Sequence, residues 1–190
     1  MRLHPKFPRR RVVVVGWGNS LRRDDGAGLQ VVERLKVRWT RRLRTLLGAQ
    51  PLPEWACGLA RADVVYFVDA STDPTVPGFR VTGLEPTGDR TRRGPHHLGP
   101  AELLAFCQAL YGHAPKAYLV EIAASDLRIG RGFSSRTTAA VARATRWLSA
   151  RLARSKSSRH GTLLAPSLSR GTESLSEELY ARSRSHARLP

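Results

Sequence analysis

Residues 12–28 read VVVVGWGNSLRRDDGAG, and this stretch decides the fold class. Its first part, residues 12–16, is a continuous β-branched run closed by glycine, which is typical of a strand buried on both faces of a parallel sheet. From Gly26 to about Leu43, apolar residues follow at helical spacing. We therefore expect a strand, a turn and a helix in that order, with Gly26 and Gly28 allowing the start of the helix to pack closely on the sheet.

The same alternation of strands and helices continues along the chain. Further strands are expected at 43–50, 63–71, 79–85 and 116–124, and helices are expected from Pro53, at 100–110 and at 135–152, the last with Ser134 or Ser135 as its N-cap. The side chains of 79–85 alternate in polarity, which favours an edge strand. This order, βαβαββαβα, predicts an α/β three-layer sandwich in which helices cover both faces of a mostly parallel twisted sheet.

The length of 190 residues suits a single domain. We place a basic N-terminal segment at 1–11, one α/β domain at 12–154 and a tail at 155–190. The tail is rich in Ser and Arg and has little apolar periodicity, so we expect it to be mostly disordered.

The lack of a recognisable targeting signal and the spacing of the cysteines indicate the same cellular compartment. No apolar run approaches the roughly 18 to 20 residues of a transmembrane helix, and no small-residue cleavage site follows the basic start. Cys57 and Cys107 stand far apart without a C-x-x-C motif, and we expect buried thiols in a reducing environment. The sequence thus predicts a cytoplasmic protein without a membrane span.

The charge is strongly positive, with 32 Lys plus Arg against 15 Asp plus Glu and a formal net charge of +17. The arginines are scattered over the chain rather than gathered in one stripe. Aromatic residues make up 7% of the chain, and no RNP-like or helix-turn-helix motif interleaves them with the basic residues. We therefore do not expect a nucleic-acid partner.

Gly16 and Gly18 follow a strand and precede a helix, as in a dinucleotide-binding motif. However, the third glycine of G-x-G-x-x-G would fall at Leu21, and Asp24 and Asp25 lie where a pyrophosphate would need bare backbone amides. The turn instead displays carboxylates.

Three polar positions are expected at the carboxyl ends of the strands, where ligands of open α/β sheets collect. Asp25 follows the first strand, Asp69 ends the strand 63–71, and His96 and His97 precede the helix at Pro100. Taken singly, these residues could be a helix cap, a turn former and exposed histidines. Their joint placement favours an N/O site for a borderline divalent ion such as nickel or zinc.

Other chemistry is weakly indicated. Glu121 lies in a buried strand pattern, which favours a paired structural carboxylate. The chain has no H-E-x-x-H motif, and Ser20, Ser71 and Ser125 have no G-x-S-x-G elbow around them. These absences argue against a zincin and a serine hydrolase.

The run VVVVGWGNSLRRDDGAGLQVVERL resembles the opening signature of the [NiFe]-hydrogenase maturation endopeptidases, a strand followed by G-x-G-N-x-L-x-x-D-[DE]-x-x-G. Three further stretches resemble the family's second block, its histidine loop and its late strand: PLPEWACGLARADVVYFVDAS, PHHLGPAELL and APKAYLVEIAASDLRIGRGFS. Together they cover about residues 12–152. The segment LGAQPLPEW departs from the G-G-T-x-G stretch that many members carry.

The resemblance implies that Asp25, Asp69 and His96 are metal ligands, with His97 as the alternative to His96. Members often carry glutamate at the position of Asp25. The resemblance also implies catalytic roles for Asp25 and Asp69, with Asp24 as an alternative base, in an aspartic-type or metal-dependent endopeptidase.

The implied activity is removal of the C-terminal extension of a hydrogenase large-subunit precursor after nickel insertion. Nickel carried by the substrate would be the recognition element, no organic cofactor would be needed, and the protein would be a monomer. The alternative is a non-catalytic metal- or partner-binding module, a maturation chaperone, that uses the same acidic cleft.

Overall fold

The structure is a computed structural model that describes residues 11–39, 43–87 and 98–157. The elements in chain order are β1 (Val12–Trp17), the 3₁₀ turn η1 (Arg23–Gly26), α1 (Ala27–Trp39), β2 (Arg44–Gly48), α2 (Trp55–Leu59), β3 (Val64–Ser71), β4 (Phe79–Leu84), α3 (Pro100–Tyr111), β5 (Lys116–Ala123) and α4 (Ser135–Ser157). Apart from the added η1, this is the order expected from the sequence. The α/β fold class is therefore confirmed.

The strands form one five-stranded sheet in the order β2-β1-β3-β5-β4. All neighbours are parallel except β4, which runs antiparallel to β5 at the edge of the sheet. The expected edge strand is therefore confirmed. From β1 the chain passes to β2 on one side and then returns to β3 on the other, so the strand order reverses at the carboxyl ends of β1 and β3.

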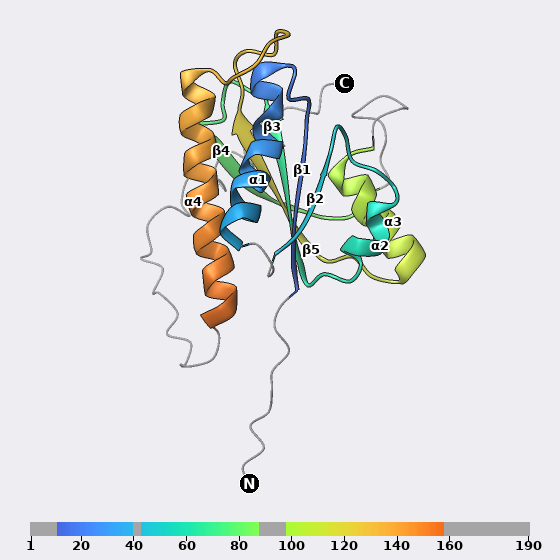
Figure 1. The fold of residues 1–190 in the computed structure, drawn as a ribbon. Coiled ribbons are helices and arrows are strands. Elements are labelled where there is room, and N and C mark those ends of the chain that lie inside the picture. The colour runs from blue at the N-terminus through green and yellow to red at the C-terminus, as the bar shows by residue number, and fades with distance from the viewer. Residues whose placement is uncertain (1–10, 40–42, 88–97, 158–190) are drawn as a thin grey trace, which may run out of the picture. The chain divides into compact units, whose positions relative to one another are not determined.

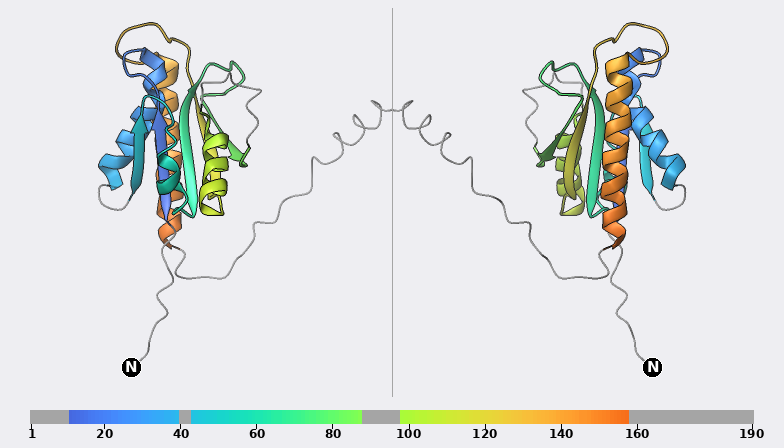
Figure 2. Two further views of the ribbon diagram at one scale, coloured as in Figure 1. Left: turned by 90° about the vertical axis from the view of Figure 1, so that its right-hand side faces the viewer. Right: turned by 90° about the vertical axis from the view of Figure 1, so that its left-hand side faces the viewer.

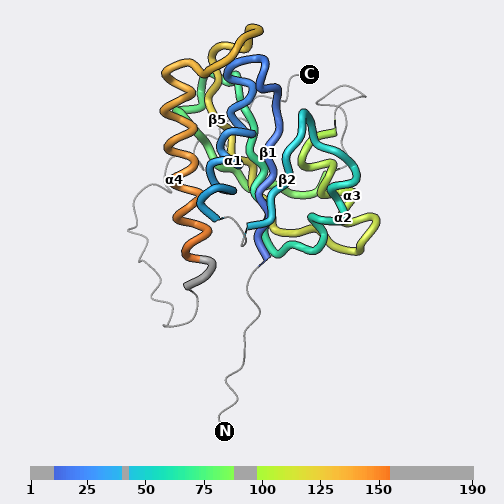
Figure 3. Tube along the Cα trace, viewed as in Figure 1, coloured from blue at the N-terminus to red at the C-terminus, as the bar shows by residue number. Residues whose placement is uncertain are grey.

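Alternating side chains of the strands build a separate apolar core on each face of the sheet. Figures 1 and 2 show the helices that cover the sheet. On one face, Val13 and Val15 pack with residues of α2 and α3. On the other face, Val14 and Val68 pack with residues of α1 and α4. The trace in Figure 3 shows α1 and α4 side by side on one side of the sheet and α2 and α3 on the other. The three-layer sandwich is thus the observed architecture.

The start of α1 packs directly on the ends of β1 and β3. A Cβ atom added to Gly28 would overlap the carbonyl oxygen of Val68 and lie 2.8 Å from that of Trp17. Only glycine fits this contact, which confirms the expectation of close packing at this position.

Several boundaries and one cysteine differ from expectation. Asp24 and Asp25 lie in η1, and α1 begins only at Ala27. The last helix continues to Ser157, past the boundary drawn at 154. Cys107 is buried as expected, but Cys57 is exposed, because α2 is a single short helix with one face toward solvent.

The N-terminal segment up to residue 10 and the tail from residue 158 lie outside the described residues. Within the part of the chain that the structure describes, no helix is both long enough and apolar enough to cross a membrane.

Candidate functional site

The candidate site lies where the strand order reverses, at the carboxyl ends of β1 and β3. In open α/β sheets this switch point leaves a crevice, because the two flanking crossovers run on opposite faces. Here the crossovers are α1 and α2, which lie on opposite faces of the sheet. Asp25 follows β1 in η1, and Asp69 lies near the carboxyl end of β3.

Asp25 is half-buried in η1 and is oriented by the turn that precedes it. Its Oδ2 atom accepts a hydrogen bond of 2.9 Å from the backbone nitrogen of Asn19. The side chain of Asn19 in turn accepts a bond of 2.9 Å from the backbone nitrogen of Leu21. Gly18 has φ of +136°, which permits this tight approach of the turn to Asp25. The turn thus holds the carboxylate in one orientation above the end of β1.

Asp69 is half-buried, and its Oδ1 atom accepts a bond of 2.9 Å from the backbone nitrogen of Ala70. It alternates with Val65 and Phe67, so it lies on the sheet face covered by α2 and α3. Leu98, which follows His97 in the sequence, packs on that same face. The first described residue after the two histidines therefore lies on the face that carries Asp69.

His96 and His97 lie outside the described residues. Among the residues that the structure describes, no three His, Cys, Asp or Glu side chains form a group that could hold a metal ion. Asp25 and Asp69 are thus at the expected edge of the sheet, while their convergence with His96 stays a prediction.

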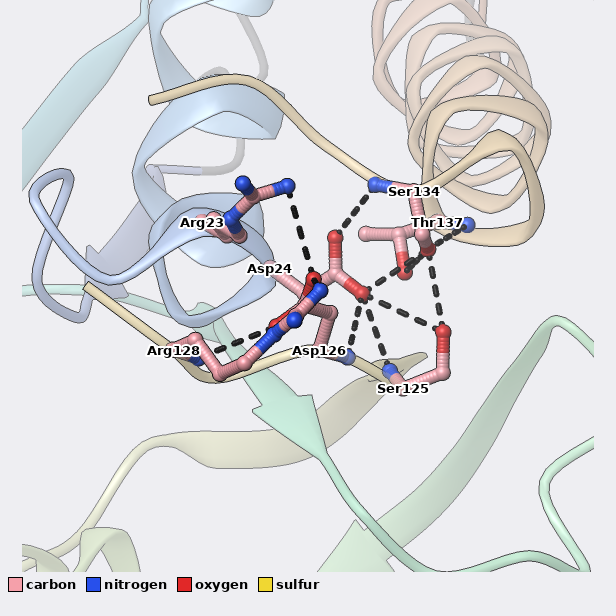
Figure 4. A network of polar contacts seen from close by, with 7 residues as sticks. All are labelled: Arg23, Asp24, Ser125, Asp126, Arg128, Ser134 and Thr137. Carbon is pink, nitrogen blue, oxygen red and sulfur yellow. Dashed lines mark hydrogen bonds and ion pairs between the residues drawn. The ribbon is translucent and has the colours of Figure 1, made fainter. Parts of the chain in front are cut away.

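Asp24 has a different environment from its neighbour (Figure 4). It is fully buried, and its carboxylate accepts bonds from the backbone nitrogens of Ser125 (2.9 Å), Asp126 (2.9 Å) and Ser134 (2.7 Å). The hydroxyl of Ser134 donates a further bond of 2.8 Å. Burial alone would raise the pKa of Asp24, but these bonds outweigh it and lower the pKa to about 2. Such a saturated carboxylate suits a structural role and argues against Asp24 as the base.

Ser134 also caps the N-terminus of α4. Its hydroxyl accepts a bond of 3.3 Å from the backbone nitrogen of Thr137, so Ser134 rather than Ser135 is the N-cap. One serine therefore caps a helix and binds Asp24 at the same time.

The loop between β5 and α4 is fixed to η1 by further contacts that the sequence did not predict. The carboxylate of Asp126 pairs with Arg128 at 2.8 Å and with Arg23 at 3.4 Å (Figure 4). Hydrogen bonds from Arg128, followed by the charges of both arginines, hold the pKa of Asp126 well below its usual range. The backbone nitrogen of Asp24 donates to the carbonyl oxygen of Asp126 at 3.0 Å. These contacts therefore hold the loop in place beside the candidate site.

Glu121 is a paired carboxylate, as expected. Nε of Arg80 donates to its Oε2 at 2.7 Å, and Nη2 donates to its Oε1 at 3.0 Å. Arg80 also pairs with Asp73 at 3.0 Å, and these bonds raise the pKa of the guanidinium further above its ordinary value. Glu121 is in register with Asp69 on the neighbouring strand. Asp69, Glu121 and Arg80 thus form one cross-strand row, which could not be predicted because the sequence does not reveal the register of β4.

Comparisons with known proteins agree with this topology. No protein-family model matches the chain, and no curated protein matches it significantly in sequence. Among solved structures, the hydrogenase maturating endopeptidase HybD from E. coli aligns with a TM-score of 0.62 and 25% identity, covering 76% of this chain and 93% of that one.

Two archaeal structures give similar alignments. The [NiFe] hydrogenase maturation protease HycI from Thermococcus kodakarensis KOD1 aligns with a TM-score of 0.62 and 22% identity, covering 76% of this chain and 93% of its own. The hydrogenase 2 maturation peptidase from a Thaumarchaeota archaeon aligns with a TM-score of 0.56 and 25% identity, covering 76% and 99%. Because the shared topology spans nearly the whole of these peptidases, the chain has the fold of the [NiFe]-hydrogenase maturation endopeptidases.

Proposed function

We propose that this protein removes the C-terminal extension of a [NiFe]-hydrogenase large-subunit precursor once nickel has been inserted. The observation that carries the proposal is the position of Asp25 and Asp69, both half-buried and both oriented by backbone N–H groups, at the switch point of this peptidase fold. Because these carboxylates are already ordered, they lose little conformational entropy when they bind a metal ion.

Nickel enters this proposal as part of the substrate. Two carboxylates with His96 as the third ligand form an incomplete N/O set, which would hold a free ion weakly. A precursor that already binds nickel through its own thiolates could add these ligands at the open positions of the ion. The protein would then sense the loaded state of the precursor.

Hydrolysis of the scissile peptide bond adds a hydroxyl group to the carbonyl carbon and a proton to the leaving amine. A carboxylate near the bond can take the proton of the attacking water and return it to the amine. We assign this role to Asp25 or Asp69 rather than to Asp24, because five hydrogen bonds already occupy the oxygens of Asp24.

The decisive experiment compares nickel-loaded and nickel-free precursor. The purified protein should contain almost no metal by elemental analysis. It should shorten the loaded precursor, seen as loss of the C-terminal peptide by mass spectrometry, and leave the nickel-free form intact. Cutting of nickel-free precursor by metal-free protein would contradict nickel sensing. Tightly bound stoichiometric zinc would instead favour an ordinary metallopeptidase.

The alternative function, a maturation chaperone, predicts stable binding of the loaded precursor without cleavage. We also propose that the protein acts in the cytoplasm as a monomer. Light scattering of the purified chain tests the monomer.

A further inference from the structure

Two large apolar side chains are exposed beside the candidate site. Leu21, in the turn between β1 and η1, is 57% exposed, and Ile129, in the loop between β5 and α4, is 87% exposed. The backbone nitrogen of Gly130 donates to the carbonyl oxygen of Leu21 at 2.8 Å, and that of Arg23 donates to the carbonyl oxygen of Gly130 at 3.2 Å. The two segments, far apart in sequence, thus lie side by side.

The backbone beneath these side chains is firmly held. Asp24 ties the loop to η1 at Ser125, Asp126 and Ser134, as described above. Arg22 adds a bond of 3.2 Å from its Nε to the carbonyl oxygen of Leu127. The loop therefore presents Ile129 to solvent from a fixed backbone.

Neither side chain contributes to the two apolar cores. Exposed apolar groups on a rigid backbone lose little conformational entropy when a partner covers them, which is the property of an interface anchor. The position of Leu21, four residues before Asp25, puts this surface next to the proposed ligands.

The surroundings of the pair are positively charged. Arg22, Arg128 and Arg131 are exposed on the same two segments. Of these three arginines, only Arg128 forms an ion pair with a carboxylate of the described residues, that of Asp126. An apolar pair bordered by arginines complements an apolar segment bordered by carboxylates.

We propose that Leu21 and Ile129 form a docking surface for an apolar segment, flanked by acidic residues, of the hydrogenase precursor. This inference rests on the proposed function, because the precursor is its occupant. The surface would seat the precursor so that its metal and scissile bond lie over Asp25 and Asp69. It would contribute to affinity rather than to the chemical step.

The test measures the dissociation constant for nickel-loaded precursor, together with KM and kcat. Ile129→Ser and Leu21→Ser should each weaken binding and raise KM by about tenfold, since each removes an exposed apolar side chain that the precursor would cover, and should leave kcat within about twofold. Val37→Ser is the matched control, because Val37 is 79% exposed but lies near the far end of α1. At 1.5 Å per residue it is about 15 Å along the helix from the site, so binding should not change.

Two further variants test the contribution of the arginines that flank Leu21 and Ile129. Arg131→Glu should weaken binding more at low than at high ionic strength, because the lost attraction is screened by salt. Arg38→Glu makes the same charge change at an exposed position of α1 and should have little effect.

The outcomes separate this inference from the proposed function. Equal affinity of wild type and Ile129→Ser, in a protein that cuts the precursor, overturns the docking surface alone. Equal weakening by Val37→Ser also overturns it. Binding that depends on Ile129 but leads to no cleavage supports the surface and contradicts the peptidase. If wild type neither binds nor cuts loaded precursor, both proposals fall.

Discussion

The Oδ2 atom of Asp24 lies 2.9 Å from the backbone nitrogen of Ser125, a residue 101 positions further along the chain. This bond joins the turn after β1 to the loop after β5. Asp24 and Asp25 are adjacent in sequence, yet the carboxylate of Asp24 holds the loop before α4, while that of Asp25 accepts a hydrogen bond from the backbone nitrogen of Asn19. Of these two neighbouring residues, Asp24 therefore has a structural role, and Asp25 is the one that we propose to be functional.

Asp24→Asn should destabilise the fold by about 2 to 4 kcal/mol. The amide cannot accept every bond that the carboxylate accepts, and it turns N–H donors toward the backbone donors of the loop. Urea unfolding of the variant measures the loss. Glu33→Gln, a carboxylate-to-amide change at an exposed position of α1, is the control and should lie within about 0.5 kcal/mol of wild type. Equal stability of Asp24→Asn and wild type would contradict the structural role.

The same carboxylate predicts a pH dependence. The pKa of Asp24 is lowered from 3.8 to about 2 in the folded protein. A lowered folded pKa contributes stability above the unfolded pKa, and the contribution is lost as the pH falls through the folded pKa. Asp24 should therefore contribute about 2 kcal/mol at neutral pH, and this should disappear between about pH 4 and pH 2. In Asp24→Asn the free energy of unfolding should depend less steeply on pH over that interval.

Gly28→Ala should destabilise the protein by more than about 3 kcal/mol, because the added methyl group meets backbone oxygens at the ends of β1 and β3 that cannot move separately. Gly58→Ala is the matched control. Nothing lies within 4 Å of a Cβ atom at Gly58, which is in α2, so alanine there should be neutral or stabilise by up to about 1 kcal/mol. Thermal unfolding of the two variants checks the contrast.

The fold was predictable because its signals are local. A few neighbouring residues were enough in each case. The β-branched run predicted that β1 is buried, the alternating polarity predicted that β4 is an edge strand, and the glycine at position 28 predicted close packing there. The placement of Asp25 and Asp69 followed from the same information, because parallel strands bring their carboxyl ends to one edge.

The contacts that support the site were not predictable in this way. Arg80 meets Glu121 across 41 positions, and Asp24 meets Ser134 across 110. Such pairs depend on strand register and on the path of the loop before α4, and neither can be predicted from a few neighbouring residues of the sequence. The different environments of Asp24 and Asp25 could not be predicted for the same reason, since the donors that saturate Asp24 come from the other end of the domain.

Deletion of residues 158–190 should change the melting temperature by less than about 2 °C and leave cleavage intact, because this segment lacks a periodic apolar face. The cut belongs after Ser157, where α4 ends, because a cut at 154 would remove the last residues of the helix. Calorimetry and the precursor assay check the two halves of this prediction. A fall in affinity confined to low salt would instead indicate electrostatic docking by the basic tail.

The proposed chemistry is tested most directly at Asp69 and Asp25. Asp69→Asn and Asp25→Asn should each lower cleavage of loaded precursor by more than about 100-fold, since an amide is a weak metal ligand and accepts no proton. Asp25→Glu should keep measurable activity, because the carboxylate remains and gains reach. Melting temperatures near that of wild type would show that the losses concern chemistry rather than folding.

Glu121→Gln is the sharpest control for these variants, because Glu121 is in register with Asp69 on the same sheet face. Its carboxylate is already committed to Arg80 through bonds of 2.7 and 3.0 Å, so we expect it to lower stability by about 1 kcal/mol and activity by less than about threefold. If instead Glu121→Gln abolishes cleavage while Asp69→Asn retains it, the acting carboxylate lies one strand further along the row. The assignment of Asp69 would then be wrong, although the location of the site at this edge of the sheet would stand.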